Sequence, residues 1–110
     1  MKISLSLPPT TNNTYFHNGP IVYKSSRARA WEEESLWKIK ANKTKLMIGE
    51  SYTMIIEMYL KFNRDIDSCC KIILDVFEKA GMYDNDSKVT SLIINKQFDK
   101  KNPRLEIDLF

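Results

Sequence analysis

At 110 residues, 43% of them hydrophobic and 28% charged, the chain is long enough for one modest core, and its composition excludes a disordered protein. The net charge of +3 is mildly basic, which suits a partner that carries phosphates. No apolar stretch reaches membrane-spanning length, and the adjacent Cys69 and Cys70 are poor partners for a disulfide. We therefore expect a single domain over residues 1–110, located in the cytoplasm.

The first half of the chain predicts a strand, a loop, a short strand and a long helix. Residues 2–7 alternate between apolar and polar, which is typical of a half-buried strand, and the prolines and asparagines of residues 8–13 predict a loop. The loop is expected to include residues 15–17, and residues 21–23 indicate a second short strand. From about residue 26 to residue 47, glutamates precede lysines, the order that suits a helix dipole. The apolar residues of this helix form two stripes, which predicts contacts with both the sheet and a partner.

The second half predicts three strands and one more helix. Residues 52–62 alternate strongly and give the clearest strand signal of the chain. Asp67 is then expected to be the N-cap of a helix over residues 68–80, with Gly81 just beyond its end. Residues 89–94 and 105–109 predict two further strands, joined by a basic turn. This order of elements predicts an α+β fold, in which two main helices pack on a mixed sheet.

Carboxylates gather around the second helix of this otherwise basic chain. Asp65 and Asp67 lie two residues apart, so in an extended segment both point to one side, and Lys71 follows one helical turn later. Asp86 precedes the next strand and would join them only through a suitable crossover. Clustered acids in a basic protein indicate a divalent cation and a phosphate substrate, and hence metal-dependent chemistry on nucleic acid.

The same acids also have a plainer interpretation. Asp67 would be only a helix cap, Asp65 a turn residue, and residues 84–86 part of a solvated loop. The protein would then be an interaction domain, which binds neither magnesium nor DNA in a salt-sensitive manner.

Three stretches of sequence resemble the RusA family of Holliday-junction resolvases. Residues 65–71 read D-I-D-S-C-C-K, close to the family pattern D-x-D-N-x-x-K, and residues 80–89 read A-G-M-Y-D-N-D-S-K-V, close to a helix ending in A-G followed by D-D-x-x-[VI]. Residues 7–15, L-P-P-T-T-N-N-T-Y, are similar to the opening of the family. The resemblance spans nearly the whole chain.

Membership of this family implies both an activity and a site. Asp65, Asp67 and Asp86 match the metal-binding aspartates of the family, and Lys71 matches its catalytic lysine. The implied protein is a magnesium-dependent endodeoxyribonuclease from a bacterium or phage, with manganese as a possible substitute. It would be a homodimer that makes paired cuts in a four-way junction, one per subunit.

Two departures from the family pattern leave a second function open. Ser68 stands where asparagine is usual, and Asn85 replaces the first aspartate of the D-D pair, although the second is retained. We expect activity to survive, but the alternative is a non-catalytic branched-DNA-binding protein with the same fold. In either case several basic side chains, near the start of the first helix and around the last turn, are candidate DNA contacts, and Arg64, which adjoins the acids, comes before the others. The remaining candidates are Lys24, Arg27, Arg29, Lys100 and Lys101, together with Lys96 and Arg104.

Overall fold

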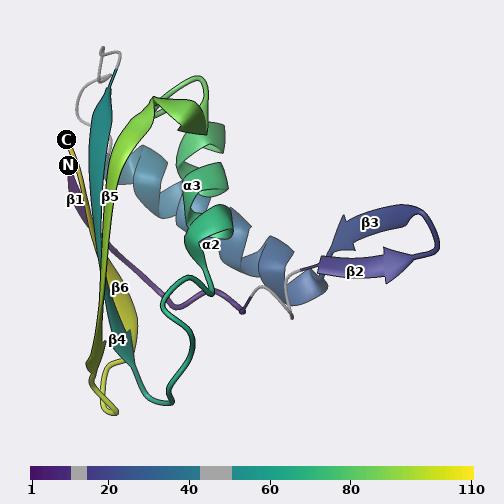
Figure 1. Cartoon of the computed structure of the whole chain (residues 1–110), viewed down its shortest axis with the longest axis horizontal. Coiled ribbons are helices and arrows are strands. Elements are labelled where there is room, and N and C mark those ends of the chain that lie inside the picture. Colours follow the sequence, from purple (N-terminus) through teal and green to yellow (C-terminus); the bar gives the residue numbers. More distant parts are fainter. Residues whose placement is uncertain (11–14, 43–50) are drawn as a thin grey trace.

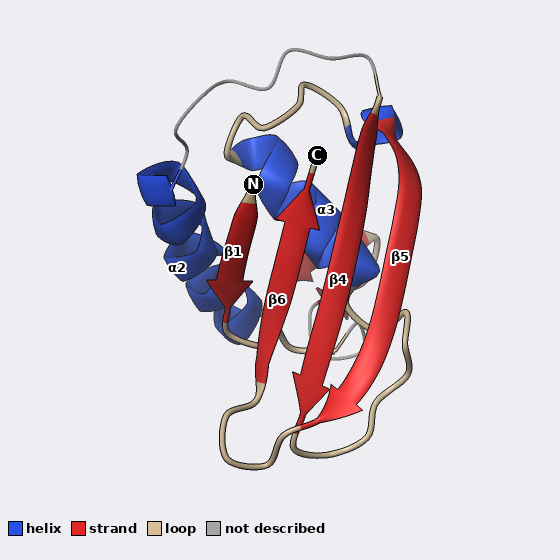
Figure 2. Cartoon of the chain, turned by 90° about the vertical axis from the view of Figure 1, so that its left-hand side faces the viewer, coloured by secondary structure: helices blue, strands red, loops and turns tan. Residues whose placement is uncertain are grey.

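The computed structural model describes residues 1–10, 15–42 and 51–110. Its main sheet has four strands in the order β1 (Lys2–Leu5), β6 (Arg104–Leu109), β4 (Tyr52–Leu60) and β5 (Val89–Phe98). β4 and β5 are parallel, and the other two pairs are antiparallel (Figure 2). The predicted mixed sheet with two main helices is therefore confirmed.

The core lies between one face of this sheet and the two helices. In β4 every second residue is buried, from Tyr52 to Leu60, because strand side chains alternate between faces and only one face meets the helices. β6 repeats the pattern with Leu105, Ile107 and Leu109. Helices α2 (Ser26–Asn42) and α3 (Cys70–Lys79) both cover this face, and the opposite face carries no helix (Figure 1).

Helix α2 packs through one stripe and leaves the other exposed. Ala28, Trp31, Ser35 and Ile39 are buried at helical spacing, whereas Trp37 is 75% exposed. The helix begins after Ser25, whose hydroxyl accepts a hydrogen bond from the backbone N–H of Ala28 at 3.1 Å. Its predicted continuation to residue 47 lies outside the described residues.

Several predicted boundaries, and one predicted loop, were wrong. The strands expected over residues 2–7 and 52–62 end at Leu5 and Leu60. Residues 15–17 belong to a strand, β2 (Tyr15–Asn18), which pairs with β3 (Ile21–Lys24) in a hairpin that projects from the body (Figure 1). Gly19, with a φ of 62°, occupies the first position of the two-residue turn, a position that favours glycine.

The connection from β4 to β5 determines where the acidic residues lie. The chain leaves β4, turns through residues 61–69, forms α3, and enters β5 through a short 3-10 helix, η1 (Asp86–Lys88). Because β5 is parallel to β4, both strands begin at the same end of the sheet. None of the helices in the described ranges is long and apolar enough to cross a membrane.

Candidate metal and nucleic-acid site

The N-terminal end of α3 is built from backbone hydrogen bonds, which leaves the acidic side chains unused. The N–H of Ser68 donates to the carbonyl of Asp65 at 3.1 Å, and the N–H of Cys70 donates to the carbonyl of Asp67 at 3.4 Å. The N-cap residue is Cys69, and no side chain caps the helix. The prediction that Asp67 is the N-cap was therefore wrong, since its carbonyl, not its carboxylate, meets the helix.

The carboxylates of Asp65 and Asp67 are exposed at this end. None of the ion pairs among the described residues involves either of them. Residues 66–69 turn instead of running extended, so strand alternation does not set how the two carboxylates approach each other. Two carboxylates two residues apart, with no ion-pair partner in the described ranges, are the kind of oxygen ligands that a hard cation takes.

Lys71 lies in the first turn of α3, with its side chain exposed. Its charge acts on Asp75, one turn further along. Burial raises the pKa of Asp75, the charges of Lys24 and Lys71 oppose this rise, and Asp86 and Glu78 add to it. Lys71 therefore lies close enough to Asp75 for its charge to favour the ionised carboxylate.

Asp86 lies beyond the other end of α3, in a segment held by hydrogen bonds. Its backbone N–H donates to Oε1 of Glu78 at 2.9 Å. Asn85 caps η1, because its Oδ1 accepts from the N–H of Ser87 at 2.8 Å. Asp84 forms an ion pair with Lys88 at 2.8 Å. Asp86 itself takes no part in the ion pairs of the described segments.

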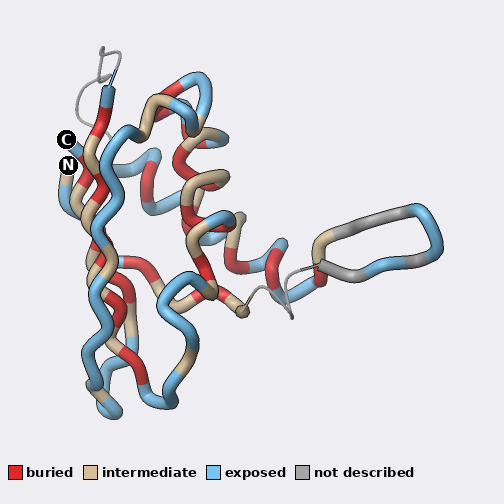
Figure 3. Tube along the Cα trace, in the orientation of Figure 1, coloured by how far each residue is buried: buried red, intermediate tan, exposed pale blue. Residues whose placement is uncertain are grey.

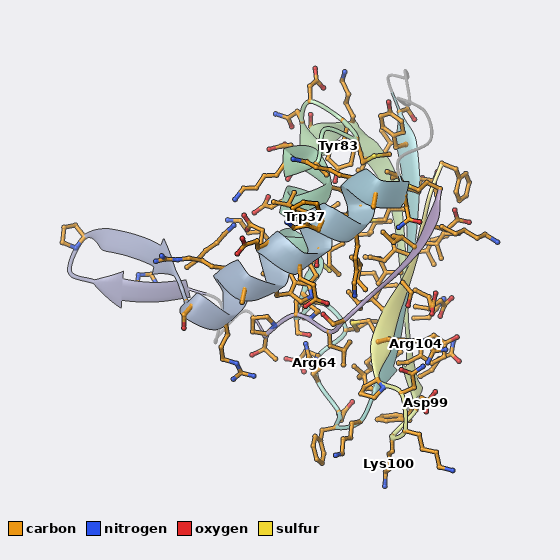
Figure 4. All side chains as sticks on the ribbon, turned by 180° about the vertical axis from the view of Figure 1, so that it is seen from behind. Trp37, Arg64, Tyr83, Asp99, Lys100 and Arg104 are labelled. Atoms are coloured by element: carbon orange, nitrogen blue, oxygen red, sulfur yellow. The ribbon has the colours of Figure 1, made fainter. Side chains whose placement is uncertain are left out.

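One chain does not bring the three matched aspartates together. The nine residues from Cys70 to Glu78 alone account for about 12 Å of helix rise, with Asp67 before them and Asp86 after them. Figure 4 shows Arg64 and Tyr83 far apart along the height of the molecule. Arg64 directly precedes Asp65, and Tyr83 lies three residues before Asp86. In the parts of the chain that the structure describes, no group of three His, Cys, Asp or Glu residues could hold a metal ion. The crossover therefore does not return Asp86 to the N-terminal end of α3.

Two residues that position Asp86 were missed at the level of sequence. Besides Glu78, the buried Tyr83 anchors this segment, since its hydroxyl donates to the carbonyl of Leu74 at 2.7 Å. Burial, and then the nearby acids Asp86, Glu78 and Asp75, raise the pKa of Tyr83 and keep the hydroxyl protonated as a donor. The stop signal at Gly81 indicated a turn here, but nothing in the sequence paired Glu78 with the N–H of Asp86.

A groove lined by two guanidinium groups includes Arg64, the residue directly before Asp65. Arg27 of α2 and Arg64 of the loop after β4 both line a hollow of about 330 Å³ beside the proline segment that follows β1. Nη1 of Arg64 donates to the carbonyl of Pro8 at 2.7 Å, and Nε1 of Trp31 donates to the carbonyl of Ser6, also at 2.7 Å. These bonds fix two walls of the hollow, which Glu34 also lines, and its two guanidinium groups are the kind of side chain that binds a phosphate.

The other predicted DNA contacts divide into engaged and exposed side chains. Lys24 forms an ion pair with Glu32, and although burial by itself would lower the pKa of Lys24, Glu32 raises it overall. Lys96 donates to Oδ1 of Asn63 at 3.0 Å and to the carbonyl of Arg64 at 3.1 Å, and thereby supports the loop that carries Arg64. The engaged group also includes Arg104, paired with Asp99 and Glu106. Arg27, Arg29, Lys100 and Lys101 are exposed, with Lys100 at the far tip of the sheet (Figure 4).

Comparison with known proteins identifies the family. The family model described as "Endodeoxyribonuclease RusA" matches residues 6–109. A crossover junction endodeoxyribonuclease RusA of Aquifex aeolicus is 31% identical over 99 residues, covering 86% of this chain and 77% of the relative. Proteins of the same name from Enterobacteria phage 82 and Escherichia coli K12 are each 27% identical over 109 residues, covering 97% of this chain and 91% of theirs. A mixed sheet with two helices and acids around a crossover helix is the setting of a nuclease domain, and the chain belongs to the RusA family.

Proposed function

We propose that this protein is an endodeoxyribonuclease that resolves four-way DNA junctions by hydrolysing phosphodiester bonds. The observation that carries the proposal is the N-terminal end of α3. There the two exposed carboxylates of Asp65 and Asp67 have no ion-pair partner in the described chain and directly follow Arg64, which lines the groove shared with Arg27. Metal-dependent hydrolysis of a phosphodiester requires carboxylates that bind the metal ion, together with cationic side chains that bind the phosphate. Asp65 and Asp67 are such carboxylates, and Arg27 and Arg64 are such cationic side chains.

The donor set fits a hard divalent cation, and we infer Mg²⁺, with Mn²⁺ as a substitute. Asp65 and Asp67 would bind it through carboxylate oxygens, whereas Asp86, the third aspartate of the family pattern, lies beyond the other end of α3 and would be a ligand only if a second copy supplied it. Held by Asp65 and Asp67, such an ion would supply a bound water of lowered pKa and Lewis-acid polarisation of the scissile phosphate. Lys71 adds a positive charge close to the same helix end, where it can oppose the negative charge that develops during the reaction.

Contacts with the DNA backbone would come first from the groove of Arg27 and Arg64. Guanidinium groups bind phosphate oxygens in a fixed geometry, which positions the strand relative to the acids. The exposed Arg29, Lys100 and Lys101 would add charge along the same molecule, whereas Lys24 is already engaged with Glu32. Paired cuts in a junction require two sites, so we infer a homodimer acting in the cytoplasm, where the DNA lies.

The experiment that tests this function is cleavage of a labelled synthetic four-way junction, with a linear duplex of the same sequence as the control. Wild type and Asp67→Asn are compared in magnesium and in EDTA. We expect paired nicks only with wild type, only in magnesium and only in the junction. If wild type makes no cut on any of several junction sequences, the nuclease proposal fails.

The alternative, a branched-DNA-binding protein without turnover, depends on Ser68 and Asn85. Asn85 offers it little support, because the side-chain oxygen that accepts from Ser87 is one that aspartate also has. Tight junction binding without magnesium-dependent cuts would favour this alternative. Absence of junction binding would contradict both functions.

A further inference from the structure

Lys96 lies on the side of β5 that faces the core. Its neighbour in the register with β4 is the buried Met58, and Ile94, two residues earlier, packs against the core. Because strand residues two apart share a face, the side chain of Lys96 leaves the sheet on that same side. Lys96 itself is exposed, so a charged residue here takes the place of an apolar one.

The loop after β4 brings its backbone to this ammonium. Residues 61–67 are exposed (Figure 3), except for the half-buried Arg64. Nζ of Lys96 donates at 3.0 Å to Oδ1 of Asn63 and at 3.1 Å to the carbonyl of Arg64. The guanidinium of Arg64 in turn donates to the carbonyl of the buried Pro8 at 2.7 Å. Side chains therefore tie this exposed loop to β5 on one side and to the proline segment on the other.

The bond to the carbonyl of Arg64 acts directly on Asp65. The carbonyl of one residue and the N and Cα atoms of the next belong to one planar peptide unit. The Cα atom of Asp65 therefore lies in the plane whose oxygen Lys96 binds. The carbonyl of Asp65 accepts from the N–H of Ser68 at 3.1 Å. The peptide units on both sides of Asp65 are thus held, which restricts the directions in which its carboxylate can point.

Lys96 holds this loop without neutralising its acid. Its two acceptors, an amide oxygen and a peptide carbonyl, are uncharged, and none of the ion pairs among the described residues involves Lys96. An ammonium paired with the carboxylate of Asp65 would compete with a metal ion for it. The observed arrangement fixes the backbone of Asp65 and leaves its carboxylate to a ligand, as residues that support metal ligands do.

We propose that Lys96 is a positioning residue of the metal site. Its ammonium fixes the peptide that precedes Asp65 and thereby sets how the carboxylate of Asp65 is presented to Mg²⁺. The inference rests on the proposed nuclease function for the role of Asp65 as a ligand. It gives Lys96 a task within the protein, in place of a contact with the DNA.

Two other roles for Lys96 predict different results. If Lys96 only added positive charge near the metal, its removal would tighten Mg²⁺ binding, because like charges repel. If Lys96 bound a DNA phosphate, its removal would lower the slope of log affinity against log salt concentration by about one, with Mg²⁺ binding to the free protein unchanged. A positioning residue predicts weaker Mg²⁺ binding by the free protein.

The test is Lys96→Met, which removes the ammonium and keeps an unbranched side chain. Calorimetric titration of the free protein should show Mg²⁺ binding about tenfold weaker than in wild type, with an unchanged circular dichroism spectrum. At saturating Mg²⁺ the variant should cut the junction at nearly the wild-type rate, because the metal ligands and Lys71 are still present. A rate that stays low there would place Lys96 in the chemical step and contradict the proposal.

The matched control is Lys2→Met, on the exposed outer face of the opposite edge strand β1, which should bind Mg²⁺ as wild type does. Mg²⁺ binding by Lys96→Met that equals or exceeds that of wild type would overturn the proposal, as would an equal loss in Lys2→Met. If wild type binds Mg²⁺ but cuts no junction, the nuclease function fails, while the titrations still decide the role of Lys96.

A second variant, Asn63→Ala, tests the same role without changing Lys96. It removes one of the two acceptors of the ammonium, and Mg²⁺ binding should weaken in the same direction by about threefold. The double variant should bind Mg²⁺ as Lys96→Met does, because the carboxamide of Asn63 acts through the ammonium. Additive losses would show that the two side chains act separately and would refute the inference.

Discussion

The two ends of α3 are held in different ways, although acids surround both. At the C-terminal end, Gly81 and Met82 donate their N–H groups to the carbonyls of Glu78 and Phe77, which is a Schellman motif. Lys79 forms an ion pair with Glu32 of α2, and Glu78 binds the N–H of Asp86. At the N-terminal end no side chain caps the helix, and backbone carbonyls alone complete the turn.

This difference separates the two tasks of the helix. Side chains at the C-terminal end are used in hydrogen bonds and ion pairs, so this end contributes stability and positions Asp86. At the N-terminal end, Asp65 and Asp67 keep their carboxylates exposed, and a missing cap costs roughly 1 kcal/mol. Exposed carboxylates that take no part in the ion pairs of the described chain are available to bind a ligand, as expected at a functional site.

The largest effect is expected from Asp67→Asn, which should reduce junction cutting about a thousandfold or more, because the metal loses a charged ligand. The free energy of unfolding should change by less than about 0.5 kcal/mol, since the carboxylate has no ion-pair partner among the described residues, and junction binding should be equal or tighter. Cleavage assays, urea unfolding and gel shifts measure the three quantities. Asp84→Asn, which removes an exposed acid paired with Lys88, is the control and should keep cutting. Complete loss of junction binding in Asp67→Asn would contradict the site.

At the other end, Gly81→Ala should destabilise the protein by about 1–2 kcal/mol, because its φ of 79° is strained for any residue with a Cβ. Cutting should also fall, since the strain displaces the segment with Asp86. Gly19→Ala is the matched control: its φ of 62° is similarly strained, but it lies in the hairpin and should leave cutting unchanged. Urea unfolding and junction cleavage are measured for both variants. Equal losses of cutting in the two would refute a specific role of the segment with Asp86.

A smaller effect is expected at Glu32, which joins the C-terminal end of α3 to α2 and β3 through Lys79 and Lys24. Burial by itself would raise the pKa of Glu32, but the two lysines lower it below 4.5. A lowered folded-state pKa gives stability that is present above pH 4.5 and lost as the pH falls through the folded-state value. Glu32→Gln should therefore cost about 1 kcal/mol at pH 7, with the difference from wild type shrinking as the pH falls below 4.5.

Unfolding by urea between pH 3 and pH 7 measures this difference. The control is Glu34→Gln, whose ion pair with Lys38 is exposed and should contribute almost nothing. A Glu32→Gln difference that stays constant over this range would mean that the charge of Glu32 does not stabilise α3.

Sequence patterns predicted the parts of the fold that depend on burial. The alternation in β4 and the stop at Gly81 were confirmed, because each follows from local geometry. The cap at Asp67 was wrong, because a carbonyl can complete the first turn as well as a side chain, and sequence does not distinguish the two. Sequence did not predict the separation of Asp86 from Asp67, because it did not show that the strands on either side of α3 are parallel neighbours. The open edge of β5 was not predicted either, because its apolar residues resemble those of a buried strand.

The smallest effect is expected from Asn85→Asp, which restores the family's residue at the C-terminal end. In the natural protein, Oδ1 of Asn85 accepts a hydrogen bond from the N–H of Ser87 at 2.8 Å, and aspartate supplies the same acceptor. The rate of cutting should therefore stay within about twofold of wild type, and the free energy of unfolding should be nearly unchanged. Asn85→Ala, which removes the acceptor, should cost about 1 kcal/mol. Urea unfolding and junction cleavage measure both variants. A tenfold gain in cutting by Asn85→Asp would instead show that the natural asparagine impairs turnover, and would move the protein towards the DNA-binding alternative.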